Sequence, residues 1–377
     1  MSARRSELRR TLTRWVKPVE LFGRRVLQYI LSIVLWLPRR PLVVPERPRI
    51  LVIRLDARVG NLLMLTPFLA SLKRTFPGAH TTVLCHESMQ RVLDGQPDVD
   101  ALIPYVKWRV GRGPFSLIAR IRKERFDLCF DAGSFPGVAV THPLIARLSG
   151  ARVIVGPDRG PLGRLYHFTV PVLAEAEHEI AQRLQLLLPF KKATRVETMR
   201  YRRDDTLRAL DAAHAAFVAA AAPAGPDRTF VCAIGSREPL RRVEAFEWAA
   251  IANALVAAGY AVTIVWGPGE RALADEVHAA CPAATVAPPS TLDELVALFR
   301  ACRGMIGNDT GTSHLAVAVG ARTCVCFVIE PPSRYGHEGP GRRALDLRND
   351  RTIERIVGEV VAWAKDAVNR GASGPDR

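Results

Sequence analysis

The amino-acid sequence predicts an α/β protein with two doubly wound parallel sheets, one in each half of the chain. Short apolar segments typical of buried strands alternate with helical segments from residue 49 onward. This alternation stops over residues 190–228, where basic residues, an alanine-rich helix and Pro223-Ala-Gly-Pro226 follow one another, and it then starts again. A chain of 377 residues also suits two domains of ordinary size better than one oversized domain.

We therefore divide the chain into four predicted segments. Residues 1–48 form a basic and apolar N-terminal segment with a linker, and residues 49–190 form the first α/β domain. Residues 191–228 connect it to the second α/β domain, residues 229–370. In the first domain we expect strands at 50–54, 81–85, 102–105, 128–130 and 153–155 and helices at 62–76 and 178–188. In the second we expect strands at 230–234, 262–266, 305–306 and 324–326 and helices at 244–258, 270–280, 292–302 and 353–367.

The positive charge of the chain is concentrated near its beginning. The formal net charge is +16, and residues 1–50 hold twelve Lys and Arg against three Asp and Glu. A basic N-terminal segment therefore supplies most of the charge, and we expect no nucleic acid among the partners of the two domains. An apolar content of 48% provides for buried cores and argues against global disorder.

The cysteines indicate neither a disulfide framework nor a zinc site. The seven cysteines are scattered, mostly within apolar segments, and no CxxC pair occurs. We expect no metal ligands among them, and a reduced, cytosolic setting fits this usage. Cys324 and Cys326 are two residues apart on a predicted strand, so they share one face of it and are expected to pack in the core.

Residues 26–37 are an apolar run of twelve residues, shorter than the roughly 20 that a membrane-spanning helix needs. Arginines flank the run on both sides, and Trp36 suits a headgroup boundary. We expect an interfacial helix that binds an anionic membrane surface. The alternative is a helix docked on the body of the protein. A cleaved signal peptide is disfavoured because Pro38-Arg39-Arg40-Pro41 is a poor cleavage site.

Residues 305–327, MIGNDTGTSHLAVAVGARTCVCF, predict a strand, a tight polar turn, a helix and a second strand. Thr310 can cap the helix at its beginning, and Gly320 stands where a C-cap is expected. Such a turn directs free backbone N–H groups and the positive end of a helix dipole into a crevice where a phosphate can bind. Asp309 and His314 are close enough to face the same ligand. An ordinary βαβ unit with Gly and Asp in its turn is the alternative interpretation.

The motifs of several other enzyme classes are missing from the sequence. There is no G-x-x-x-x-G-K-[ST] phosphate loop and no G-x-G-x-x-G after a strand. No G-x-S-x-G elbow and no H-E-x-x-H helix occur either. A phosphate site in this protein is therefore expected at the 305–327 block.

The 305–327 block resembles the C-terminal signature of the heptosyltransferases, G-N-D-[TS]-G-x-x-H-L-A-A-A-x-G. Residues 50–67 resemble the N-terminal signature of that family, a strand followed by a glycine-containing loop and a helix. Residues 233–243, AIGSREPLRRV, resemble its G-[AS]-S-x-P-x-K-R-W-P segment. These matches occur in the family's order and extend over residues 49–330.

The resemblance implies a GT-B fold, with two Rossmann-like domains facing across a cleft. It implies an inverting, metal-independent glycosyltransferase without a cofactor, which moves a heptose from ADP-heptose to a lipopolysaccharide-core acceptor that is linked to lipid. Such an enzyme would be cytoplasmic and peripheral on the inner face of the bacterial inner membrane. The alternatives are the same fold with another nucleotide sugar and another surface glycan, or a non-catalytic nucleotide-sugar-binding homologue.

The resemblance also places the donor on the second domain. Ser236, with Arg241 and Arg242 in the Lys-Arg places of the family, would neutralise the diphosphate. An arginine pair on a solvated loop is the alternative for these two. Glu270 would bind the ribose of the nucleotide, or else only cap the helix that follows it. The expected donor-binding residues of the 305–327 block are Asp309, Thr310, Gly311 and His314.

The acceptor loop departs from the family at one position. Arg58 and Gly60 match this loop, and in the family a carboxylate directly after the glycine is the general base. Here that residue is Asn61, whose amide cannot accept a proton at neutral pH. Asp56 is the nearest replacement carboxylate in the loop. Asp56 is therefore either the base or a turn residue, and in the second case the activity is lost or uses another base.

Overall fold

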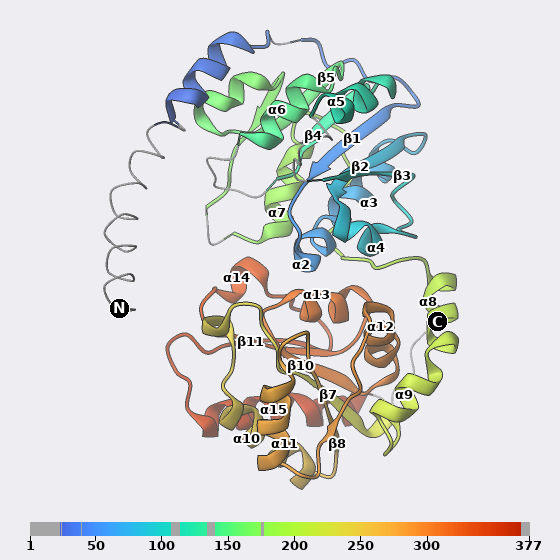
Figure 1. The fold of residues 1–377 in the computed structure, drawn as a ribbon, viewed down its shortest axis with the longest axis vertical. Helices are drawn as coiled ribbons and strands as arrows, with labels where there is room; N and C mark the ends of the chain where they lie inside the picture. Colours follow the sequence, from blue (N-terminus) through green and yellow to red (C-terminus); the bar gives the residue numbers. More distant parts are fainter. Residues whose placement is uncertain are drawn as a thin grey trace, which may run out of the picture.

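The computed structural model describes residues 25–38, 40–106, 114–133, 140–174 and 177–370, together with Gly23. Figure 1 shows two lobes, one above the other, each built around a sheet flanked by helices. Each sheet has six strands, and the strand pairs in both are parallel. The strand orders are β3-β2-β1-β4-β5-β6 and β12-β11-β10-β7-β8-β9, so both sheets are doubly wound, as the sequence predicts.

The first lobe follows the alternation expected from its sequence. Its strands are β1 (Arg49–Arg54), β2 (His80–His86), β3 (Ala101–Tyr105), β4 (Leu128–Asp131), β5 (Val153–Pro157) and β6 (Phe168–Val170). Its helices are α2 (Val59–Leu63), α3 (Thr66–Thr75), α4 (Gln90–Leu93), α5 (Pro114–Lys123), α6 (Thr141–Leu148) and α7 (Glu179–Leu184).

The second lobe repeats the arrangement. Its strands are β7 (Thr229–Ala233), β8 (Ala261–Val265), β9 (Thr285–Val286), β10 (Gly304–Asn308), β11 (Thr323–Phe327) and β12 (Arg342–Asp346). Its helices are α10 (Ala245–Ala257), α11 (Arg271–Ala280), α12 (Leu292–Ala301), α13 (Gly311–Ala318), α14 (Pro332–Tyr335) and α15 (Ile353–Arg370). The helices α8 (Asp204–Ala213) and α9 (Ala215–Ala221) precede it.

The predicted helix at 62–76 is two helices in the structure. α2 ends at Leu63, and α3 starts at Thr66 with Pro67 in its first turn. Proline is tolerated at that position because its missing N–H would have no partner inside the helix. The break turns α2 away from α3, so that the beginning of α2 faces the second lobe (Figure 1).

The helices α8 and α9 lie against the second lobe. The guanidinium of Arg300, on α12, donates two hydrogen bonds of 3.0 Å to the carboxylate of Asp211, on α8. The hydroxyl of Thr263, on β8, donates to the carbonyl oxygen of Ala221 at the end of α9. We therefore propose that the hinge within the predicted 191–228 connection lies before α8, in the extended segment that ends near Arg203.

The buried apolar side chains form one cluster within the first lobe, one within the second, and a third that includes residues of both. Cys324 and Cys326 are both fully buried in the core of the second lobe, which confirms the prediction for this pair. The largest side chain with no exposure is Trp248, on α10. It packs among the aliphatic and aromatic residues of β7, β8 and α15.

Replacing Trp248 with alanine is expected to lower the free energy of unfolding by about 3–5 kcal/mol, because a large buried side chain is lost and a cavity remains. Phe246, on the same helix, is 61% exposed, and its replacement by alanine is the matched control with an expected change within about 0.5 kcal/mol. Urea denaturation of the two variants measures both. Equal losses would contradict the assignment of α10 to the core.

The N-terminal apolar run is helical over residues 25–34 and rests on the first lobe beside α6 (Figure 1). Arg147, on α6, donates a hydrogen bond of 2.9 Å to the carbonyl oxygen of Leu35. The N–H of Leu37 donates a hydrogen bond of 3.0 Å to the carbonyl oxygen of Arg164. Ser32 is buried on this side. The opposite side leaves seven large apolar residues exposed: Val26, Leu27, Tyr29, Ile30, Ile33, Val34 and Trp36.

The structure thus bears on both interpretations of this segment. The helix is docked on the body of the protein, and it also presents an apolar face to its surroundings. Among the helices of the described residues, none is long and apolar enough to cross a membrane. The basic residues at the beginning of the chain, which belong to the same prediction, lie outside the described residues.

Candidate active site

A cavity of about 590 Å³ lies where the two lobes meet, and residues of both lobes line it. The first lobe contributes residues 58–61, at the beginning of α2, and Met64, directly after its end. The second lobe contributes the segments that follow β7, β8 and β10. In doubly wound sheets ligands bind beyond the carboxyl ends of the strands, which is where these three segments begin.

Asn308 holds two of these segments together at the end of β10. Its amide nitrogen donates to the carbonyl oxygens of Ile234 and Gly235, and its amide oxygen accepts a hydrogen bond of 2.9 Å from the N–H of Val243. Asn308 is fully buried. Its side chain therefore fixes both ends of the loop that carries Ser236 and Arg241.

The N-terminus of α13 opens into the cavity. Thr310 occupies the N-cap position, but its side chain makes no capping hydrogen bond within the described part of the chain, contrary to the prediction of a capping role. Thr310, Gly311 and Thr312 all line the cavity. The uncapped end of α13 therefore offers backbone N–H groups and a positive dipole end to an anion.

Gly60 and Gly311 let the two lobes approach each other closely. A Cβ atom on Gly60 would lie 2.5 Å from Cδ2 of His314 and 3.4 Å from the Cα of Gly311. A Cβ on Gly311 would lie 3.2 Å from the backbone nitrogen of Gly60. The resemblance assigns Gly60 to the acceptor loop, and the structure places His314 of the opposite lobe against it.

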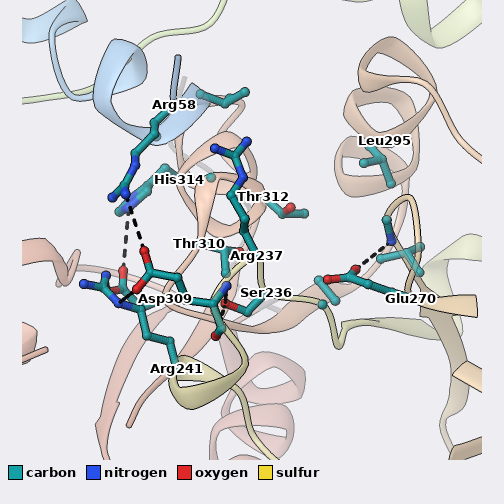
Figure 2. Close-up of a pocket in the computed structure, with 18 of the residues that line it drawn as sticks. Arg58, Ser236, Arg237, Arg241, Glu270, Leu295, Asp309, Thr310, Thr312 and His314 are labelled. Carbon is teal, nitrogen blue, oxygen red and sulfur yellow. Dashed lines mark hydrogen bonds and ion pairs between the residues drawn. The ribbon is translucent and has the colours of Figure 1, made fainter. Parts of the chain in front are cut away.

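Three arginines and three carboxylates line the cavity, and the carboxylates are those of Glu238, Glu270 and Asp309. Arg58, Arg237 and Arg241 line it, and Arg237 extends between His314 and Thr312 in Figure 2. The guanidinium of Arg241 is 2.6 Å from a carboxylate oxygen of Glu330 and 3.1 Å from one of Glu238. Arg58 forms an ion pair of 3.4 Å with Glu238, and this pair joins the two lobes across the cavity.

Asp309 lies on the same side of the cavity, close to Arg241. One of its carboxylate oxygens is 3.9 Å from the guanidinium of Arg241. Burial raises the pKa of Asp309 to about 6, although Arg241 opposes the shift. A carboxylate that is largely excluded from water is suited to accept hydrogen bonds from a ligand hydroxyl.

Glu270 lies at the opposite end of the cavity, beside Leu295 (Figure 2). Its carboxylate accepts a hydrogen bond of 2.8 Å from the N–H of Gly267 and lies directly over Gly235. Glu270 stands at the N-cap of α11 but makes no capping side-chain bond among the described residues. The capping interpretation of Glu270 is therefore wrong, and its carboxylate lines the cavity.

Among the described residues that line this cavity, His314 is the only histidine. Its Nε2 is 3.7 Å from a carboxylate oxygen of Asp309, and its Nδ1 is 2.9 Å from Nε2 of His337. Burial, helped by the neighbouring His178, lowers the pKa of His314 to about 4. The ring is therefore neutral at physiological pH.

Asp56 lies apart from this group. It is not among the described residues that line the cavity. One of its carboxylate oxygens is 2.7 Å from Nε of Arg54, whose side chain is fully buried at the end of β1. Arg54 also pairs with Glu179 and donates a hydrogen bond to the carbonyl oxygen of Ala132. Asp56 thus belongs to a network of ion pairs inside the first lobe.

Most of the site residues predicted from the sequence line the cavity, together with several residues that were not predicted. Arg242 is not among its described lining residues; its carbonyl oxygen accepts a hydrogen bond from Arg351. The sequence did not predict some lining residues, such as Tyr335 and Arg237. Tyr335 reaches the cavity only through the fold, whereas Arg237 directly follows the predicted Ser236 and could have been found from it. The predicted residues that line the cavity are Arg58, Gly60, Asn61, Ser236, Arg241, Glu270, Asp309, Thr310, Gly311 and His314.

Two doubly wound lobes with a shared cavity at the carboxyl ends of their strands define the GT-B class of glycosyltransferases. The family model "Glycosyltransferase family 9 (heptosyltransferase)" matches residues 166–352. The chain belongs to this family, and the protein is a glycosyltransferase.

Relatives with established names agree with this. The chain is 26% identical over 286 residues to lipopolysaccharide heptosyltransferase 3 from Escherichia coli, covering 69% of this chain and 78% of that protein. It is 24% identical over 320 residues to lipopolysaccharide heptosyltransferase 1 from Pseudomonas aeruginosa, covering 80% and 84% of the two chains.

Solved structures share the fold. A glycosyl transferase of family 9 from Veillonella parvula superposes with a TM-score of 0.72 at 19% identity, covering 86% of this chain and 97% of that one. The E. coli heptosyltransferase WaaC with ADP superposes with a TM-score of 0.65 at 17% identity, covering 84% and 99%. At these identities the likeness concerns the fold alone.

Proposed function

We propose that the protein transfers a heptose from ADP-heptose to a lipopolysaccharide-core acceptor, with inversion at the anomeric carbon and without a metal ion. The observation that carries this proposal is the cavity between the lobes, which combines an uncapped helix N-terminus with the guanidinium groups of Arg58, Arg237 and Arg241. This arrangement suits a diphosphate, which gains negative charge as it leaves the sugar.

The length of the cavity suits a nucleotide sugar. At one end Glu270 would accept hydrogen bonds from the ribose, with Leu292 and Leu295 beside the base. At the other end Asp309 would accept hydrogen bonds from the sugar that is transferred. Arg237 and the N-terminus of α13 lie between these ends, and Arg58 and Arg241 lie at the end of Asp309. Together they would hold the diphosphate. The names of the relatives, lipopolysaccharide heptosyltransferases 1 and 3, support a heptose and a lipopolysaccharide acceptor.

The test is a transfer assay with radiolabelled ADP-heptose and a truncated lipopolysaccharide core, run with and without EDTA. We expect label in the lipid fraction, equal in both conditions. Transfer from another nucleotide sugar would favour a different surface glycan. ADP binding without transfer from any donor would favour a non-catalytic homologue, the alternative to which Asn61 points.

We also propose that the exposed apolar face of the helix at residues 25–34 holds the enzyme on the inner face of the inner membrane, where a lipid-linked acceptor is found. Its exposed residues recur at helical spacing, and Ile33 and Val34 are 68% and 72% exposed. Arginines at both ends of the run in the sequence would contact anionic headgroups.

The variant Ile33→Glu with Val34→Glu is expected to lose at least about ten-fold in binding to anionic liposomes, because two apolar contacts are replaced by charges that the surface repels. Flotation measures the bound fraction. Phe246→Glu, at an exposed apolar residue on α10, is the matched control and should float like the unaltered protein. Equal flotation of all three proteins would exclude this face as the contact.

A further inference from the structure

The proposed transfer needs a group that removes the proton of the acceptor hydroxyl, and the first lobe does not offer one at the expected position. Asn61 carries an amide, which is not a base at neutral pH. Asp56 is held 2.7 Å from the buried Arg54, so accepting a proton would break an ion pair and leave a buried guanidinium with less compensation. A replacement base must therefore come from elsewhere in the cavity.

The second lobe places an imidazole directly against this position. A Cβ on Gly60 would lie 3.3 Å from Nε2 of His314, so this nitrogen is next to the loop that ends in Asn61. His314 lines the cavity on the side where Arg58 and Asp309 also lie (Figure 2). The imidazole thus occupies the region between the donor-sugar end of the cavity and the acceptor loop.

We propose that His314 is the general base of the transfer reaction and that His337 is the residue that positions it. The proposal rests on the proposed function, since it assigns a step of that same reaction. His314 accepts the proton at Nε2, and its Nδ1–H donates the hydrogen bond of 2.9 Å to Nε2 of His337. This bond selects the tautomer whose lone pair faces the cavity.

A hydrogen bond from the first lobe holds the loop that carries His337. Nε2–H of His178, at the beginning of α7, donates a hydrogen bond of 2.8 Å to the carbonyl oxygen of Gly336. Nδ1 of His178 accepts one of 3.2 Å from the N–H of Ile180. His178 belongs to the first lobe and Gly336 to the second, so this bond forms only when the lobes are together. Among the described residues no His, Cys, Asp and Glu side chains are grouped to hold a metal ion.

The reaction balances with these groups. The acceptor oxygen forms a bond to the anomeric carbon as its proton moves to Nε2 of His314. The bond from the anomeric carbon to the diphosphate breaks, and the electron pair leaves with the diphosphate beside Arg241 and the N-terminus of α13. The products are the glycoside, ADP and an imidazolium on His314, which returns its proton to water when the products leave.

The surrounding charges suit this cycle. Besides His178 and His337, the groups that face His314 are Asp309 in the turn before it, Glu179 on α7 and the ring of Tyr335 at the end of α14. At a pKa of about 4 the resting imidazole is neutral but a weak base, and the negative charge of the bound diphosphate would raise that pKa toward the range of a general base. The imidazolium would lie 3.7 Å from the carboxylate of Asp309 and near the diphosphate, and both negative groups stabilise it.

Kinetics of three variants test the proposal. His314→Gln keeps the polar bulk, and it is expected to lower kcat by about 100-fold or more while ADP binding, measured by calorimetry, changes less than about three-fold. His314→Ala leaves space for a small base, so added imidazole should restore part of its activity. Asp56→Asn should retain most of the transfer rate. A loss with Asp56→Asn as large as that with His314→Gln would overturn the assignment.

His337 is tested by a pair of substitutions. His337→Gln retains an acceptor for Nδ1–H of His314, whereas His337→Leu removes it. The leucine variant should lose kcat and move the acid limb of the pH profile of kcat/KM to lower pH, because the imidazolium loses a partner. The glutamine variant should keep most of the kcat and most of the pH profile of the unaltered protein. Identical profiles for the two variants would refute the positioning role.

The proposed function and this inference fail in different ways. If the unaltered protein transfers no sugar, both are wrong. If it transfers sugar and the His314 variants keep its kcat, only the assignment of the base is wrong. Loss of ADP binding together with activity in His314→Gln would likewise overturn it, since His314 would then be a donor-binding residue, as the sequence predicts.

Discussion

Replacing Gly235 with alanine is expected to weaken ADP binding by about 30-fold or more. A Cβ at this position would lie 1.8 Å from Oε2 of Glu270 and 2.5 Å from its Cδ. The carboxylate is the mobile end of its side chain, so it gives way and loses its hydrogen bond to Gly267. The backbone need not move, and the cost in folding free energy stays near 1 kcal/mol. A loss of about 2 kcal/mol of binding free energy corresponds to the 30-fold change.

Two comparisons isolate this effect. Calorimetric titration with ADP measures the affinity, and Glu270→Ala should weaken it to the same degree. Adding Gly235→Ala to Glu270→Ala should then change little, because the methyl group has nothing left to displace. The matched control is Gly358→Ala on α15, where the new Cβ would meet no atom of the structure within 4 Å. Additive losses in the double variant would show that Gly235 acts independently of Glu270.

The sequence predicted the central strands well because their burial is complete. β1, β4, β7 and β11 are buried along almost their whole length and read as continuous apolar segments. Three of the four edge strands were missed for the opposite reason. β6, β9 and β12 are short or only half-buried, and Arg342 and Arg343 open the last of them. Such segments lack the apolar run from which a parallel strand is recognised.

The candidate site was predictable where its residues are adjacent in sequence. Asp309 to His314 form one turn and helix, and their common orientation follows from local geometry. Gly336 and His337 belong to a loop without a motif, and they reach His314 only because α7 and α13 meet across the lobes. The expectation for Asp56 came from its distance along the chain to Asn61, whereas the buried Arg54 decides where its carboxylate points.

Replacing Asp309 with asparagine is expected to stabilise the protein without ligand at neutral pH. Burial raises the pKa of Asp309 from its usual 3.8 to about 6. An acid with a raised pKa disfavours the folded state once it must ionise, so the cost is absent below pH 3.8 and complete above pH 6. The difference corresponds to about 3 kcal/mol at most, and Asp309→Asn should recover about 1–3 kcal/mol of it at pH 7.5.

The same variant should lose transfer activity by about 100-fold or more, because the carboxylate that faces both the donor sugar and the His314 imidazole is gone. Urea denaturation at pH 4.5 and pH 7.5 measures the stability change, which should grow with pH as Asp309 ionises. Asp275→Asn, at an exposed residue of α11, is the control and should shift the midpoint little at either pH. A gain that is equal at both pH values would contradict the origin in ionisation. A destabilising buried charge is expected to be kept where it serves function. A gain in stability at pH 7.5 with full activity would therefore contradict a ligand-binding role for Asp309.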